Sequence, residues 1–239
     1  MIEQIITWDQ QLLIAINNWN SPFMDQVMWY ISTKWLWIPL YLLLAALLCH
    51  RFGWKRGLLY VVGIVLAVGL SDWITSGVLK PWVARLRPTR DPVVAPFLHI
   101  VNGYRGGKYG FPSSHAANCM TIALLYTLLT ARHPFKALPG LSSCSQPSER
   151  PFCAIGHKKK RSPHACVLLL LWTLMVSYSR MYLGVHFPLD ILTGLLTGAL
   201  VALLAAAFLT GGERTYHKHF SSDRSSGGGG DSNSQLVYS

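Results

Sequence analysis

Five apolar runs, each close to the length that a helix needs to cross a bilayer, constrain this chain more than any other feature. The runs cover residues 35–49, 57–79, 116–131, 165–183 and 189–210. A bilayer core takes about 20 residues of helix, in which every backbone polar group finds its partner inside the segment. Charged residues make up only 13% of the 239 residues, about half of what a soluble domain carries. We therefore expect an all-α fold, a polytopic membrane helical bundle with five spans, and not a soluble enzyme.

The N-terminal segment, residues 1–34, is expected to lie in the membrane interface. Polar residues such as Asp9 interrupt its apolar ones, which suits an amphipathic helix better than a span; if the segment does cross, the bundle has six spans. Residues 35–210 then form the membrane domain, with a long basic loop at 133–164. Residues 211–239 contain four consecutive glycines and are expected to form a disordered tail.

The net charge of +11 sets the expected orientation. Thirteen of the 21 Lys and Arg residues lie in the segments 50–56, 132–164 and 211–239, and an excess of basic residues marks the cytoplasmic side. The segments 80–113 and 184–188 then face the outer side of the inner membrane. Because the basic residues lie between apolar runs and not along one solvated face, we expect membrane lipids and an anionic substrate as partners, and no nucleic acid.

The first of three candidate functional clusters is cationic and consists of Lys80, Arg85, Arg87 and Arg90. Pro81 disfavours helix at the residue before it, so the second span is expected to end at Lys80 and to release the chain at the interface. Like charges repel, so a cluster this dense favours an anion-binding site. Snorkelling of the basic side chains toward lipid phosphates is the alternative.

The second cluster, Pro112-Ser113-Ser114-His115, directly precedes an apolar run. Serine before a helix is typical of an N-cap, and a helix N-terminus presents free N–H groups and the positive end of its dipole to an anion. A phosphate held there would have His115 beside it. A capped helix with an interfacial histidine is the structural alternative.

The third cluster contains Arg180, His186 and Asp190, with Pro188 placed to begin the last helix. Ionisable side chains this close to apolar helices need partners. A carboxylate one turn beyond His186 can hold one ring nitrogen and leave the other free as a nucleophile. A structural His–Asp pair fits the spacing equally well.

Taken together, the three clusters favour phosphoryl transfer. Cations and N–H groups would hold the phosphoryl oxygens while one histidine attacks and the other protonates the leaving group. The sequence has no metal-binding spacing such as HExxH and only ten Asp and Glu residues, so we expect neither a metal nor a cofactor. Asp72, roughly 12 Å deeper than Lys80 at about 1.5 Å per helical residue, either supports Lys80 or Arg87 or forms an interhelical hydrogen bond.

In these motifs the chain resembles the type 2 phosphatidic acid phosphatase (PAP2) superfamily, which also includes the vanadium haloperoxidases. The family signatures are K-x6-R-P, P-S-G-H and S-R-x5-H-x3-D. They read here Lys80-x6-Arg87-Pro88, Pro112-Ser113-Ser114-His115 and Ser179-Arg180-x5-His186-x3-Asp190. Ser114 is the one departure, since it stands where the signature has glycine. The resemblance covers about residues 57–205 and implies a helical bundle.

For the site, the resemblance implies a phosphohistidine on His186, oriented by Asp190, with His115 as proton donor and then as base for water. The groups expected to bind the phosphoryl oxygens are Lys80, Arg87, Arg180 and the amides of Ser113 and Ser114. The residues expected to support them are Asp72, Pro88 and Pro112.

For function, the resemblance implies a metal-independent membrane lipid phosphatase with its site at the outer leaflet. Undecaprenyl diphosphate is the first expected substrate and lipid A phosphate the second, followed by phosphatidylglycerophosphate and phosphatidate. Two other classes stay open: a vanadate-dependent haloperoxidase, which would be soluble, and a non-catalytic binder of lipid phosphates.

Overall fold

The computed structural model describes residues 1–132 and 164–226, with side chains as far as residue 210. Within these residues the regular structure is helical apart from one β-bridge between Leu86 and Tyr109. The main helices are α1 (Ile2–Asn18), α2 (Pro22–Ser32), α3 (Ile38–Phe52), α4 (Trp54–Asp72), α5 (Lys80–Val83), α6 (Ser114–Arg132), α7 (His164–Tyr182) and α8 (Pro188–Ser226). The expected all-α fold is confirmed.

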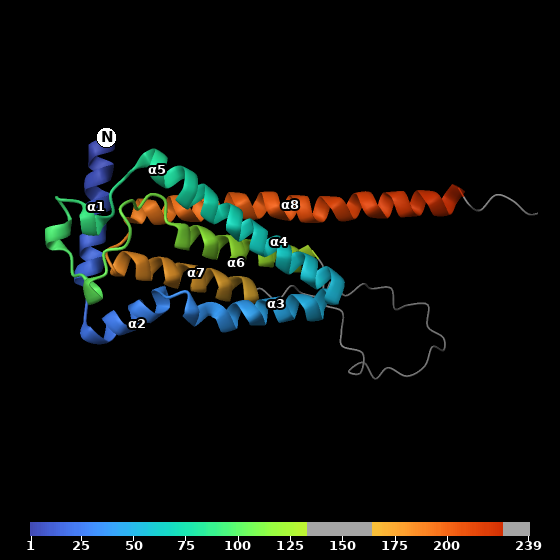
Figure 1. The fold of residues 1–239 in the computed structure, drawn as a ribbon, viewed down its shortest axis with the longest axis horizontal. Coiled ribbons are helices and arrows are strands. Elements are labelled where there is room, and N and C mark those ends of the chain that lie inside the picture. Colours follow the sequence, from blue (N-terminus) through green and yellow to red (C-terminus); the bar gives the residue numbers. More distant parts are fainter. Residues whose placement is uncertain (133–163, 227–239) are drawn as a thin grey trace, which may run out of the picture.

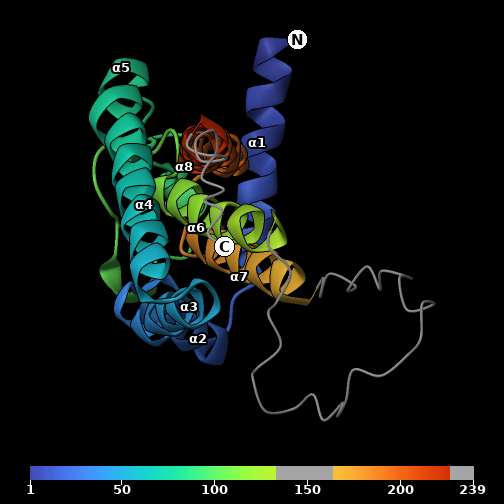
Figure 2. The ribbon, with the colours of Figure 1, turned by 90° about the vertical axis from the view of Figure 1, so that its right-hand side faces the viewer.

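Helices α3, α4, α6, α7 and α8 run along the long axis of the molecule and form the bundle (Figure 1). Within residues 1–132 and 164–226, four helical stretches are long and apolar enough to cross a membrane: Trp35–Phe52, Trp54–Val83, His164–Tyr182 and Pro188–Thr210. The fifth expected span falls within α6, which is less apolar. In the end-on view, α6 lies between α4, α7 and α8 (Figure 2), and it packs against all three. A helix covered by protein needs less apolar surface than one that faces lipid on most sides.

Two glycines on α8 let it approach the N-terminal half of α6 closely. A Cβ atom at Gly194 would lie 2.4 Å from the carbonyl oxygen of Ser113, and one at Gly198 would lie 2.2 Å from that of Ala117. The Thr121 hydroxyl also donates to the Gly198 carbonyl over 3.2 Å. Helices in membranes associate through small residues of this spacing because backbones can then touch. The contact fixes the start of α6 against the first turns of α8.

The second span does not end at Lys80, so the prediction made from Pro81 is wrong. From α4 the helix continues through a π-helical segment, Trp73–Leu79, into α5, and stops at Ala84, whose φ is 50°. Pro81 lies just after the π-helical segment, as the second residue of α5. The wider turns of the π-helical segment change the hydrogen-bond register just before it. Lys80 is therefore presented from a helix and not from a loop.

Helix α1 lies across one end of the bundle (Figures 1 and 2). Its buried side chains are Asp9, Leu13 and Asn17, which are spaced by four residues and so share one face. Trp8 and Leu12, by contrast, are exposed. Two of the three buried side chains are thus polar, and apart from Leu13 the apolar side chains of α1 are mostly exposed.

At the end of the bundle opposite α1, helix α8 continues to Ser226. The structure differs here from the disordered tail that the sequence predicts for residues 211–239, because an established helix extends at little cost per residue. Residues 227–239 lie outside the described part of the chain, as does the expected basic loop 133–164 except for His164.

Candidate active site

Two hydrogen bonds bring the three sequence motifs together at the end of the bundle that α1 crosses. The Lys80 Nζ donates to the hydroxyl of Ser114 over 3.0 Å, which joins the first motif to the second. The Ser113 amide donates to the Asp190 carbonyl over 2.8 Å, which joins the second motif to the third. The motif residues therefore surround one site, although they are separated by up to about a hundred positions in the sequence.

His186 lies at the centre of this site, in the turn between α7 and α8. Its side chain is 1% exposed, and Nδ1 is 3.5 Å from Oδ2 of Asp190. Among the described residues neither ring nitrogen has a hydrogen-bond partner. Burial, together with the charges of Arg87, Arg180 and Lys80, holds the pKa of His186 well below its usual 6.5. The ring is therefore neutral at pH 7, the form in which imidazole is a nucleophile.

Asp190 occupies the first turn of α8 and is fully buried. Its Oδ2 accepts from the Phe187 amide over 3.0 Å, so its side chain reaches back to cap the helix that carries it. The same oxygen faces Nδ1 of His186. The sequence spacing thus places the carboxylate beside the ring, and Nε2 is left on the side away from Asp190.

Arg87 is held by the loop in front of α6 and is 9% exposed. Its Nε donates to the Tyr109 carbonyl (3.1 Å) and its Nη1 to the Val185 carbonyl (3.4 Å). Gly106 has a positive φ of 63°, and a Cβ there would lie 2.7 Å from Arg87 Nη1, so only glycine leaves room for the guanidinium. Burial and the nearby charge of Arg180 lower the pKa of Arg87.

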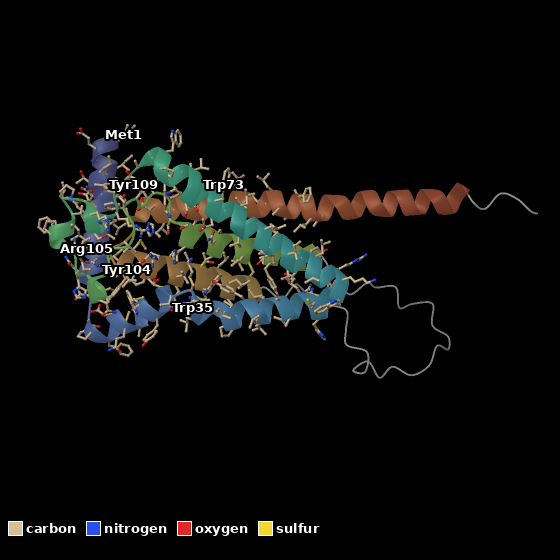
Figure 3. The ribbon with its side chains drawn as sticks, in the orientation of Figure 1. Met1, Trp35, Trp73, Tyr104, Arg105 and Tyr109 are labelled. Carbon is tan, nitrogen blue, oxygen red and sulfur yellow. The ribbon has the colours of Figure 1, made fainter. Side chains whose placement is uncertain are left out.

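Arg180, on the last turns of α7, is 3% exposed. It donates from Nη1 to the Ser32 hydroxyl and from Nη2 to the Tyr104 hydroxyl over 3.4 Å. Burial raises the pKa of Tyr104, but the charge and hydrogen bond of Arg180 outweigh burial and lower it overall. Figure 3 shows Tyr104 with Tyr109 at this end of the molecule. Three buried or half-buried cations, Lys80, Arg87 and Arg180, thus lie together, an arrangement that an anion would stabilise.

The start of α6 differs from the prediction in one respect. The Ser113 amide donates to Asp190 and its Oγ accepts from the Ala116 amide (3.5 Å). We therefore correct the predicted phosphate contact of Ser113: its amide and hydroxyl are used to cap α6 and to tie it to α8. The amides of Ser114 and His115, in the first helical turn, have no carbonyl to bond within the helix. These amides and the Ser114 hydroxyl are the groups at this helix start that can reach an anion.

The three residues expected to support the site have different surroundings. Pro88 and Pro112 are buried, and Pro88 begins a short 3-10 turn just after Arg87. Asp72 is exposed and accepts from the Asn118 amide on α6 over 3.1 Å. Of the two alternatives left open for Asp72, the structure shows the interhelical hydrogen bond.

The sequence places Arg85 in the first cationic cluster and assigns no role to Asp9, but it does not predict that these two residues contact each other and the site. Arg85 donates from Nη1 to Oδ1 of Asp190 (3.0 Å) and from Nη2 to Oδ2 of Asp9 (2.6 Å). Asp9, from α1, also accepts from the Leu189 amide at the start of α8 over 2.8 Å. A signal existed, since a lone carboxylate on an apolar helix needs a partner, but nothing in the sequence indicates that the partner lies 76 residues away.

Two cavities meet at His115. One, of about 410 Å³, lies between α3, α4 and α6; its walls are apolar, with Lys34, Asp72, Ser114 and His115 among its few polar residues. The other, of about 680 Å³, lies near the α2–α3 junction, where Figure 3 places Trp35. Trp29, Trp35 and Tyr104 line it together with Lys34, His115 and Arg180. The described side chains contain no group of three His, Cys, Asp or Glu placed to hold a metal ion.

Comparisons with known proteins agree with the motifs. The sequence matches the PAP2 superfamily over residues 56–214. A lipid A 4'-phosphatase of Bacteroides thetaiotaomicron is 34% identical over 199 residues, which cover 83% of this chain and 75% of that protein. A lipid A 4'-phosphatase of Porphyromonas gingivalis is 29% identical over 202 residues, 84% of this chain and 72% of that protein.

Among solved structures, the transmembrane PAP2-type phosphatidylglycerolphosphate phosphatase of Bacillus subtilis has a similar fold. It superposes with a TM-score of 0.57 at 24% identity and covers 86% of each chain. The helical bundle, the three motifs at one of its ends and the match over most of the membrane domain lead to one conclusion: the chain belongs to the PAP2 superfamily, in the branch that is embedded in the membrane.

Proposed function

We propose that this protein removes a phosphate from a membrane lipid through a phosphohistidine intermediate on His186. The observation that carries the proposal is the buried, neutral imidazole of His186 beside Asp190 and within the field of three cations. A ring in this state has a free lone pair on Nε2, and the cations favour a phosphoryl group in front of it. Lys80, Arg87 and Arg180 supply the positive charge that other phosphatases take from metal ions.

In the first step the Nε2 lone pair attacks phosphorus and the bond from phosphorus to the leaving oxygen breaks. His115 gives a proton to that oxygen. Burial and the charge of Arg180 lower the pKa of His115 to about 2, so the ring holds this proton only with the negative charge of the bound phosphate group beside it. In the second step the neutral His115 takes a proton from water, whose oxygen attacks phosphorus while the N–P bond breaks. The products are the dephosphorylated lipid, inorganic phosphate and the starting imidazole. Throughout both steps Asp190 stays ionised, accepts a hydrogen bond from the Nδ1–H group of His186, and stabilises the positive charge that the ring acquires.

A lipid substrate is supported by the apolar cavity between α3, α4 and α6. His115 and Ser114 lie at its edge, and its other lining residues are mostly aliphatic. Its volume of about 410 Å³ suits part of a hydrocarbon chain. A substrate whose chain enters this cavity would have its phosphate next to the start of α6.

The second cavity supports a bulky headgroup on the leaving side. Aromatic side chains of Trp29, Trp35 and Tyr104 and the ammonium of Lys34 line it, a combination that contacts both the faces and the hydroxyls of a sugar. Together with the two lipid A 4'-phosphatase relatives, this places lipid A phosphate ahead of undecaprenyl diphosphate in our proposal, the reverse of the order expected from the sequence. Undecaprenyl diphosphate is the second candidate, because the apolar cavity accepts a prenyl chain equally well.

The charge distribution supports a location in the inner membrane with the site on the outer, periplasmic side. Arg51 lies in the last turn of α3, and Lys55 and Arg56 lie in the first turn of α4. The junction of these helices is at the end of the bundle away from the site (Figure 1), and an excess of basic residues favours the cytoplasmic side. The site end would then lie at the level of the outer headgroups, where a lipid phosphate is found.

The test is phosphate release from a panel of lipids by the purified protein in detergent micelles. The panel contains lipid A, undecaprenyl diphosphate, phosphatidylglycerophosphate and phosphatidate at equal mole fraction. We expect the highest kcat/KM with lipid A, and we expect His186→Ala to release no phosphate. His50→Ala, which changes an exposed histidine on α3, is the matched control and should equal the wild type.

Three outcomes would count against parts of the proposal. If His186→Ala releases phosphate at the wild-type rate, the nucleophile is misassigned. A wild-type protein that binds these lipids without turnover would be the non-catalytic binder considered above. Bromide oxidation in the presence of vanadate and peroxide, without lipid phosphate hydrolysis, would indicate the haloperoxidase class instead.

A further inference from the structure

We propose that Asp9 and Arg85 are positioning residues that hold Asp190 for catalysis, so that the N-terminal helix α1 is a working part of the site. This inference rests on the proposed function, because it assigns to Asp190 the task of orienting His186. Asp9 and the whole of α1 lie outside residues 56–214, the part of the chain that matches the PAP2 superfamily.

The contacts form a chain from α1 to the nucleophile. Arg85 lies between two carboxylates, 2.6 Å from Oδ2 of Asp9 and 3.0 Å from Oδ1 of Asp190. The side chains of Asp9 and Asp190 are 1% and 0% exposed, and that of Arg85 is 23% exposed. The Arg85 guanidinium also stacks 4.0 Å from the centre of the Phe187 ring. A guanidinium held on both edges and one face cannot swing toward a substrate.

The arrangement gives the arginines different tasks. Arg87 uses two of its donors on backbone carbonyls. Arg85 instead contacts two carboxylates. When a phosphate group binds, it pairs with Lys80, Arg87 and Arg180. The buried carboxylate of Asp190 then remains paired with Arg85. An unpaired buried carboxylate would otherwise take up a proton and lose its ability to accept from His186.

The geometry at Asp190 also selects which oxygen faces the histidine. Oδ1 accepts from Arg85, and Oδ2 accepts from the Phe187 amide while it faces Nδ1 of His186 at 3.5 Å. With both oxygens held, the carboxylate cannot rotate. The remaining lone pair of Oδ2 is therefore kept for the ring, and the 3.5 Å between Oδ2 and Nδ1 should shorten to a hydrogen bond when the ring becomes positively charged.

Asp9 completes the arrangement from α1. One of its oxygens holds Arg85 and the other accepts from the Leu189 amide in the first turn of α8. Two turns along α1, Asn17 binds the backbone in the same way: it donates to the carbonyls of Tyr182 and His99. The buried face of α1 thus combines Leu13 with two polar side chains that bind other segments at this end of the bundle, while Trp8 is 62% exposed.

Two variants test the ion pair between Asp9 and Arg85 separately from the hydrogen bond that Asp9 accepts from the Leu189 amide. Asp9→Asn keeps an oxygen for the Leu189 amide but turns an NH2 group or a neutral oxygen toward Arg85. Arg85→Lys keeps the charge but cannot bridge two carboxylates. Asp25→Asn is the matched control: Asp25, on α2, accepts from Tyr182 and pairs with His99 at 2.8 Å, away from Asp190. Residues that orient a functional histidine are worth about 10- to 100-fold in activity.

We expect Asp9→Asn and Arg85→Lys each to lower kcat about 10- to 100-fold with KM within about twofold of wild type, while Asp25→Asn matches wild type. Rapid-quench measurements with radiolabelled lipid should show slower formation of phosphohistidine in both variants. Arg85→Gln, which removes the cation, should in addition move the acidic limb of the pH profile of kcat/KM to higher pH. The other groups that act on His186 there, Lys80, Arg87, Arg180 and His115, are unchanged in these variants.

Each outcome either supports or refutes the positioning role of Asp9 and Arg85. If Asp9→Asn and Arg85→Lys have wild-type kcat while His186→Ala is inactive, the relay is refuted and the proposed function stands. If His186→Ala is active, the proposed function fails first. Should Asp9→Asn unfold at the assay temperature, Arg85→Lys, which leaves the cap on Leu189 intact, gives the answer: an unchanged pH profile and kcat would refute the proposal, and a lower kcat in a folded protein would support it.

Discussion

Replacing Gly194 by alanine tests whether the close contact between α6 and α8 sets the geometry of the site. The new Cβ would lie 2.4 Å from the Ser113 carbonyl oxygen, about 1.0 Å short of ordinary contact at 3.4 Å. The clash is with backbone, so no side chain can move aside, and α8 must shift by about that distance. The hydrogen bond from the Ser113 amide to Asp190, now 2.8 Å, would lengthen toward about 3.8 Å, which is no longer a hydrogen bond.

Two consequences are expected from this shift. Overpacking of a tight interface costs about 1 to 3 kcal/mol of stability, visible as a lower Tm in detergent. A displacement of about 1 Å between the histidine–aspartate pair and the start of α6 should lower kcat by up to about 100-fold. Gly69→Ala on α4 is the control, because a Cβ at Gly69 meets nothing within 4 Å; it should keep kcat and gain up to about 1 kcal/mol from helix propensity. Wild-type kcat and Tm for Gly194→Ala would refute the reasoning.

Four further predictions rest on the charges of the site. Burial and the charges of Arg87, Arg180 and Lys80 hold the pKa of His186 well below 6.5, so the acidic limb of the pH profile of kcat/KM should lie below pH 6.5. We expect a bell-shaped profile, in which the alkaline limb reports the proton donor. A flat profile from pH 4 to 9 would contradict paired histidine catalysis. Below that pH the unfolded chain binds a proton that folded His186 does not, so the free energy of unfolding measured in detergent should fall as the pH drops. Arg87→Lys should lower kcat/KM about 10- to 100-fold, since an ammonium cannot hold two carbonyls and a phosphate together, and an unchanged value would remove Arg87 from the site. EDTA should leave phosphate release unchanged, because the chain itself supplies the cations; loss of activity that added metal restores would show that the site is misread.

Several parts of the site could be predicted from the sequence because they depend on local spacing. His186 and Asp190 are four residues apart at a helix start marked by Pro188, so one helical turn brings them side by side. His115 follows two serines at the start of an apolar run, and the structure places it in the first turn of α6. Arg87 and Arg180 belong to the first and third motifs, and both guanidinium groups are buried near His186.

Other features depend on how distant segments meet, and these the sequence could not indicate. The continuation of the helix through Pro81 depends on a π-helical segment that no local pattern marks. The Ser113 amide is free in an isolated helix, but the close approach of α8 gives it the Asp190 carbonyl as a partner. In the sequence, Asp9 is a polar residue that interrupts the apolar pattern of an interfacial helix, and its partner Arg85 is one of four basic residues in a cluster.

The sequence by itself determined that this chain forms a helical bundle in a membrane, because apolar runs of this length leave the backbone no other way to satisfy its hydrogen bonds there. It also determined the order and spacing of the reacting groups. The tertiary structure alone decided which charges pair with which: Arg85 with Asp9 and Asp190, and Arg87 with backbone carbonyls. The reason is that an ion pair in a buried site depends on distances of about 3 Å, and only the packing of α1, α6 and α8 fixes distances between residues so far apart in the sequence.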